Sequence, residues 1–211
     1  QGAAQATQQA YTNRALSTDT TATTKLTDLA RRNGDSLGIT DSDTVNISYV
    51  KDGKTYSASF SAKDATVEDI FTKMNAIDGD VFDVAGLSTT SVIGTDAYGE
   101  EKQTVDGENA LTIKAKTAGK DGAIAGFTIG ITDSKGQEKK SVNNVFNEFT
   151  ETIEPRNAAS DSSLYAQTSA DANRGMKISL GDMRAEALGL RGRDGTVLSV
   201  TTKEGANAAM N

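Results

Sequence analysis

The feature that most constrains the fold is a pair of alternating segments on either side of an Asp-Gly step. Residues 45–50 place apolar side chains at every second position, and residues 56–60 return with the same period. A period of two is that of a β-strand, and Asp52-Gly53 is a preferred two-residue hairpin turn. The sequence therefore predicts an antiparallel β-hairpin here.

A helix is expected after the hairpin. Apolar residues recur at helical spacing to form one stripe, namely Val67, Ile70, Phe71, Met74 and Ile77. Thr66, with Asp69 three residues later, has the pattern of a capping box at the helix start. We expect this helix to pack on the hairpin sheet, and the alternative is a Met-lined binding groove.

Later segments repeat both kinds of pattern. Residues 110–115 and 127–131 alternate as strands do, whereas 141–153 carries apolar residues at helical spacing and is followed by Pro155, the only proline. The expected fold class is α+β, elongated, with β-hairpin sheets each covered by a helix and joined to a small β-rich strip.

Composition points to a thin core. Hydrophobic residues make up 36% of the chain, aromatic residues 5%, and there is no Trp. Such a core suits a body of small layers better than a compact enzyme with a deep pocket. Charged residues, at 24%, are ordinary for a globular chain, so wholesale disorder is not expected.

The charge excludes several partners. The formal net charge is −7, and Lys139-Lys140 and the Arg191/Arg193 pair are isolated rather than clustered. Nucleic acid and anionic membrane surfaces need clustered Lys and Arg, so neither is an expected partner. No apolar run approaches the roughly 20 residues that a membrane-spanning helix needs, so no membrane insertion is expected.

The sequence offers few of the side chains that usually carry out catalysis or bind transition metals. The chain contains no Cys and no His, which removes Ser-His-Asp triads, Cys-His dyads and His-containing zinc sites. The acidic runs 41–43 and 78–83 lack the pattern of a calcium loop, and Gly119-Lys120 lacks that of a phosphate loop. Carboxylate pairs that meet in space are not excluded by sequence. We expect no catalytic residue, no metal and no cofactor.

Three regions are expected along the chain. Residues 1–24 are rich in Gln, Ala and Thr and predict an extended or partly helical arm, with 5–16 the helical part. Residues 25–160 form an outer insert, with 25–85 and 86–160 as its two subdomains. Residues 161–211 contain a second hairpin, a short helix and the start of another helix. The first residues lack the pattern of a secretory signal, so we expect a cytosolic protein, export without a cleaved signal, or an excised fragment.

The last region carries a resemblance. Met176–Leu190, with Asp-Met-Arg-Ala-Glu-Ala-Leu-Gly at 182–189, closely resembles the segment of bacterial flagellins that re-enters the filament core after the variable insert. Residues 200–209 resemble the start of the long carboxy-terminal core helix of that family. Residues 25–29 followed by the hairpin resemble inserts of flagellins and hook-associated proteins more weakly, and residues 126–129 and 143–153 resemble the end of such an insert.

The resemblance implies a structural role. The chain would be a fragment of the flagellar filament subunit, a secreted, self-assembling protein that supports swimming motility, with the insert as the antigenic outer surface. It implies an extracellular location and partners that are other flagellin subunits, with an export chaperone and an innate immune receptor bound through regions mostly outside this chain. The residues implied in packing on the core are Met176, Ile178, Leu180, Met183, Leu188 and Leu190.

Three alternatives stay open beside it. A hook-associated junction protein is the nearest in class, a surface adhesin or glycan-binding module is a different class, and a hydrolase is the third. Ser and Thr runs at 20–24 and 88–91 are interpreted as a hydrated outer face, with O-linked sugars as the alternative.

Overall fold

The computed structural model describes residues 4–158, 162–167 and 175–180 and divides the chain into two compact units. One unit is Gln5–Ala158. The other comprises Gln1–Ala4 and Ala159–Asn211, in which strands β9 (Ser162–Gln167) and β10 (Gly175–Leu180) form an antiparallel pair. With small antiparallel sheets and two α-helices among the described residues, the expected α+β class is confirmed.

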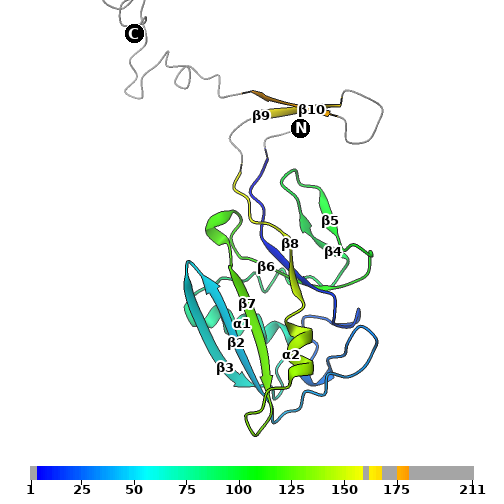
Figure 1. The fold of residues 1–211 in the computed structure, drawn as a ribbon, viewed down its shortest axis with the longest axis vertical. Coiled ribbons are helices and arrows are strands. Elements are labelled where there is room, and N and C mark those ends of the chain that lie inside the picture. Colours follow the sequence, from blue (N-terminus) through cyan, green and yellow to red (C-terminus); the bar gives the residue numbers. More distant parts are fainter. Residues whose placement is uncertain (1–3, 159–161, 168–174, 181–211) are drawn as a thin grey trace, which may run out of the picture. The chain divides into compact units, whose positions relative to one another are not determined.

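The main sheet of the larger unit has the order β3-β2-β7 (Figure 1). Its strands are β2 (Thr44–Lys51), β3 (Lys54–Ser61) and β7 (Gly126–Thr132). Asp52 and Gly53 have φ values of 51° and 73°, as a type I′ hairpin turn requires. The predicted hairpin is confirmed.

One face of this sheet is apolar and buried. Val45, Ile47 and Tyr49 of β2 point into the core, and helix α1 (Val67–Asp78) contacts β2 and β3 on that face. The helix starts at the expected capping box, and Met74 is fully buried. The predicted packing of a helix on the hairpin sheet is confirmed, and the methionine belongs to the core rather than to a groove.

A second sheet has the order β6-β1-β8, formed by β1 (Ala10–Asn13), β6 (Leu111–Lys114) and β8 (Phe149–Ile153). The expectation of a helix at 5–16 is wrong, because residues 10–13 are the middle strand of this sheet. Pairing on both sides satisfies the backbone of β1, and Ala10, Thr12 and Asn13 are buried between its neighbours. Residues 5–24 are therefore part of the larger unit rather than a separate arm.

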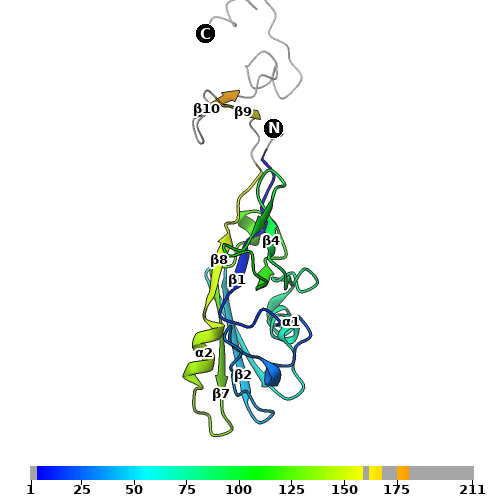
Figure 2. The same ribbon diagram turned by 90° about the vertical axis from the view of Figure 1, so that its right-hand side faces the viewer.

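The prediction of a helix over residues 141–153 is correct only for the first half of this range. Helix α2 covers only Lys140–Phe146, and strand β8 begins at Phe149. Three of the five residues of the segment Phe-Thr-Glu-Thr-Ile are β-branched, so it fits a strand where β1 pairs with it. Both helices contact the sheet β3-β2-β7, so the expectation of one helix for each sheet is not met (Figure 2).

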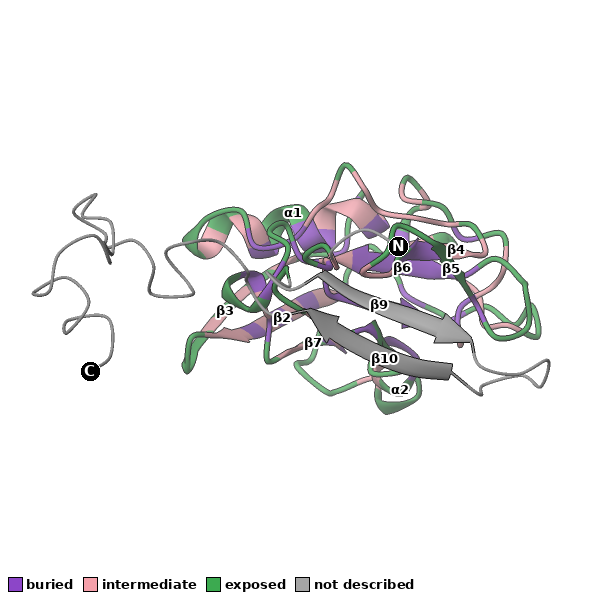
Figure 3. Ribbon diagram, turned by 90° about the horizontal axis from the view of Figure 1, so that it is seen from above, coloured by how far each residue is buried: buried purple, intermediate pink, exposed green. Residues whose placement is uncertain are grey.

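One large hydrophobic core joins the two halves of the larger unit, and Ala10, Ile93 and Ile153 form a small second cluster. Phe71 and Phe82 lie within 5.4 Å of each other between ring centroids, and Phe127 lies 5.8 Å from Phe71 and 5.4 Å from Phe82. Figure 3 shows the buried residues gathered between α1 and the strands. The expected boundary between 85 and 86 does not divide this core. The remaining elements are β4 (Val92–Thr95), β5 (Glu101–Gln103) and the 3-10 turns η1 (Leu26–Asp28) and η2 (Lys120–Gly122).

Candidate functional site

The chain comes into and leaves the larger unit through two segments that lie side by side (Figure 2). Thr7 forms an antiparallel bridge with Arg156, and its N–H donates to the Arg156 carbonyl over 2.9 Å. The Thr7 hydroxyl donates to the Glu154 carbonyl at 2.6 Å and accepts from the Arg156 N–H at 2.9 Å. Strands β1 and β8 continue the pairing. The two ends of the larger unit are therefore adjacent.

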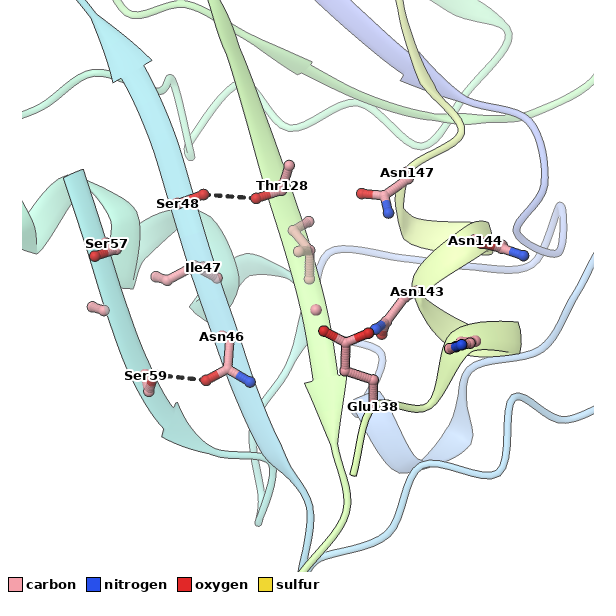
Figure 4. A pocket seen from close by; sticks show the side chains of 14 residues that line it. Asn46, Ile47, Ser48, Ser57, Ser59, Thr128, Glu138, Asn143, Asn144 and Asn147 are labelled. Carbon is pink, nitrogen blue, oxygen red and sulfur yellow. Dashed lines mark hydrogen bonds between the residues drawn. The ribbon is translucent and has the colours of Figure 1, made fainter. Parts of the chain in front are cut away.

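The outer face of the sheet β3-β2-β7 forms a groove together with α2 (Figure 4). Most of its lining side chains end in a hydroxyl or an amide, because the polar positions of the alternating strands all point to this face. The polar residues of the lining are Asn46, Ser48, Ser57, Ser59, Thr128, Glu138, Lys140, Asn143, Asn144 and Asn147.

Side chains on the strand side of the groove are held by each other. The hydroxyls of Ser48 and Thr128 are 2.6 Å apart. Ser59 donates to Asn46 Oδ1 at 2.7 Å, and Asn46 Nδ2 donates to the Thr132 hydroxyl at 3.2 Å. A ligand would therefore meet donors and acceptors that are already oriented, which lowers the entropic cost of binding.

Asparagines of α2 form the other wall. Asn143 Oδ1 accepts from the Ile131 N–H at 2.6 Å and so caps the edge of β7. The side-chain amide of Asn147 has no hydrogen-bond partner among the described residues, and in Figure 4 it points toward β7 and Thr128. The Ser57 hydroxyl likewise has no partner among the described residues, so both groups are available to a ligand.

The groove is lined mainly by groups that hydrogen-bond. Glu138 is the one carboxylate and Lys140 the one ammonium among its lining residues. Hydroxyls and amides in this number can hydrogen-bond a neutral polar ligand, such as a sugar, from both donor and acceptor groups. The described residues contain no group of three His, Cys, Asp or Glu that could hold a metal ion.

Asp43, in the acidic run 41–43, forms an ion pair with Lys139 next to α2. Asp43 is 2% exposed and accepts from Lys139 Nζ at 2.6 Å and from the Thr40 N–H at 2.8 Å. Burial alone would raise the pKa of Asp43, but the hydrogen bonds from Lys139 and Thr40 outweigh it and hold the pKa below its ordinary value. Its carboxylate thus fastens the loop before β2 to the start of α2.

The residues that the sequence predicted for core packing fall in the smaller unit. Met176, Ile178 and Leu180 alternate along β10, where their backbones pair with Ala166, Leu164 and Ser162. Met183, Leu188 and Leu190 lie outside the described residues. The packing role of all six stays a prediction.

Sequence reasoning missed the groove. The polar positions of residues 46–48 and 57–59 were visible as half of an alternating pattern, and 143–147 is rich in asparagine. Nothing local indicated that the helix would lie beside this face. The contact follows from the short turn that brings α2 back against β7.

Comparisons with protein-family models, with curated proteins and with solved structures find no match for this chain. None of the helices in the described part of the chain is both long enough and apolar enough to cross a membrane.

Proposed function

We propose that this chain is part of a bacterial flagellin, in which residues 5–158 are an outward-facing insert. The observation that carries the proposal is the pairing of Thr7 with Arg156. A unit whose two ends are adjacent can be added to a filament subunit without moving apart the strands that receive it.

Two features of the sequence and structure support this role. The segment 176–190 resembles the part of flagellins that returns to the filament core after the insert. The insert itself has its own hydrophobic core and a hydrated outer face rich in hydroxyls and amides. Its partners would be other flagellin subunits, and its location would be the extracellular filament.

Excision of the insert from the full-length parent tests the proposal. Residues 8–155 are replaced by a two-residue Asn-Gly turn, which joins Thr7 to Arg156 in their existing register. We expect the shortened subunit to be exported and to assemble into thinner filaments visible by electron microscopy. A control deletion of equal length, shifted to residues 11–158, keeps Thr7 and strand β9 but removes Arg156, and we expect no filaments from it.

The proposal fails if the 8–155 deletion yields soluble, exported protein but no filaments. It also fails if the control deletion assembles equally well, because the pairing at Thr7 would then be irrelevant. If the protein forms only short caps or junctions instead of long filaments, the alternative of a hook-associated protein would be favoured.

A second candidate function is glycan binding, which the groove beside α2 favours. A glycan array probed with the purified chain tests it, with Asn147→Ala and Ser57→Ala as variants and Ser134→Ala as a control on an exposed turn. We expect each groove variant to weaken binding about tenfold, the equivalent of one lost hydrogen bond. Binding that neither variant changes would place the site elsewhere, and an array without binding would remove this candidate.

A further inference from the structure

Strand β3 has one edge that no other element pairs with. It is the outer strand of the sheet β3-β2-β7, and it stands at the margin of the larger unit in Figure 1. The hairpin closes at Lys51 and Lys54, so alternate residues from Thr55 to Ser61 direct their backbone N–H and C=O groups away from β2. Among the described residues, no backbone or side chain hydrogen-bonds to these groups.

The opposite edge of the same sheet is capped near its end at Ile131. The Ile131 N–H donates to Asn143 Oδ1, and the Ile131 carbonyl accepts from the Lys139 N–H. Helix α2 and the residue before it thus cap β7 at Ile131, whereas β3, a strand of 8 residues, has no such cap.

Natural proteins usually protect a long edge with charge, proline or a bulge. Residues 55–61 have none of these: every side chain is uncharged, there is no proline, and the register with β2 is continuous. An edge of this kind is a template for another strand.

We infer that β3 pairs with β3 of a second copy of this chain, in an antiparallel register centred on Ala58. In this register Tyr56 lies opposite Phe60 of the partner subunit, and Ser57 lies opposite Ser59 of the partner subunit. Residues that face the core stay on one face and polar residues stay on the other, which a shift by one residue would not allow. The edge is therefore complementary to itself.

Side-chain chemistry supports this register. Tyr56 and Phe60 are only half-buried within one copy, and a partner strand would cover them further. Aromatic pairs across antiparallel strands are stabilising, and no like charges oppose each other from 55 to 61. The backbones of Ser57 and Ser59 would supply the hydrogen bonds of the new ladder.

This contact is independent of the proposed filament role. A pair centred on Ala58 has twofold symmetry, so it cannot be the contact that repeats along a helical filament. It would join units of two separate filaments, or two copies free in solution.

Charge substitution tests the pairing and its register. The variant Ser57→Lys/Ser59→Lys and the variant Ser57→Glu/Ser59→Glu each place like charges opposite each other in a homodimer. We expect the 211-residue chain to form a dimer with a dissociation constant below about 1 mM, measured by sedimentation equilibrium. Each variant alone should dimerise about tenfold more weakly, and an equal mixture should recover the dimer.

A control variant, Ser134→Lys/Gln137→Lys, adds the same charge at an exposed turn and should leave dimerisation unchanged. A wild-type chain that stays monomeric at about 1 mM overturns the inference. Variants that dimerise as well as the wild type, or a mixture that fails to recover the dimer, overturn it equally. Circular dichroism of each variant confirms that it is folded.

Cross-linking gives a second readout, because the chain has no cysteine. Ala58 faces its own counterpart across the twofold axis, so Ala58→Cys should form an intermolecular disulfide under mild oxidation. Thr55→Cys lies roughly 20 Å from its counterpart in this register and should not. Equal cross-linking of the two variants would contradict the register.

Discussion

The ion pair between Asp43 and Lys139 makes a prediction that separates its two partners. Asp43 is 2% exposed, whereas the Lys139 side chain is 25% exposed and also donates to the Gly38 carbonyl at 2.8 Å. Removing the lysine leaves a buried carboxylate with the Thr40 N–H as its remaining partner. Removing the charge of the aspartate leaves an ammonium that water can reach.

The two substitutions should therefore differ in cost. Lys139→Met should lower the free energy of unfolding by about 3–5 kcal/mol, as expected for an unpaired buried charge. Asp43→Asn keeps the shape of the side chain and an oxygen that accepts from Thr40 and Lys139, so it should cost only about 1–2 kcal/mol. Urea unfolding followed by circular dichroism at pH 7 measures both.

The pH dependence follows from the lowered pKa of Asp43. A carboxyl with a folded pKa below its unfolded value stabilises the fold above the unfolded value, here 3.8, and loses this effect as pH falls through the folded pKa. The difference in stability between the wild type and Asp43→Asn should therefore be full at pH 7 and shrink below pH 3.8.

Asp64→Asn is the matched control, because Asp64 forms an exposed pair with Lys25 in which the side chains are 72% and 53% exposed. It makes the same change of charge and should produce no measurable loss of stability. The reasoning is refuted if Asp43→Asn costs more than Lys139→Met, or if both behave like the control.

Three further changes in the larger unit should be measurable by the same urea unfolding. Gln9→Leu removes the partner of the Ile124 N–H, which donates to Gln9 Oε1 at 2.7 Å, and should cost about 1–3 kcal/mol; no loss would mean that this N–H finds another acceptor. Phe71→Ala empties a fully buried position and should cost about 3–5 kcal/mol, and a cost under about 1 kcal/mol would deny it a place in the core. Tyr49→Phe removes a buried hydroxyl that has no partner among the described residues and should raise stability by about 1 kcal/mol, whereas a loss would reveal a hidden partner.

The sequence predicted elements correctly where the decisive contacts are local. The hairpin at 45–60 is specified by its own alternation and by Asp52-Gly53, and the helix at 67–78 by its stripe and capping box. Both patterns act between residues a few positions apart, so they can be read without knowledge of the rest of the chain.

Prediction failed where the partner is distant. Residues 10–13 and 149–153 were both expected to be helical, yet they pair with each other across more than a hundred residues. Such pairing overrides weak local preference and leaves no local signal. The groove was missed for the same reason, because Asn143 and Asn147 reach the sheet only through the tertiary position of α2.

The most direct measurement is the position of the larger unit on cells that make the full-length protein. The chain has no cysteine, so Ser134→Cys on an exposed turn provides a single thiol for a maleimide dye. If residues 5–158 are the outer insert of a flagellin, filaments should be labelled along their whole length, with one dye per subunit. Label found only at filament junctions, or on the cell body without filaments, would contradict the proposed role.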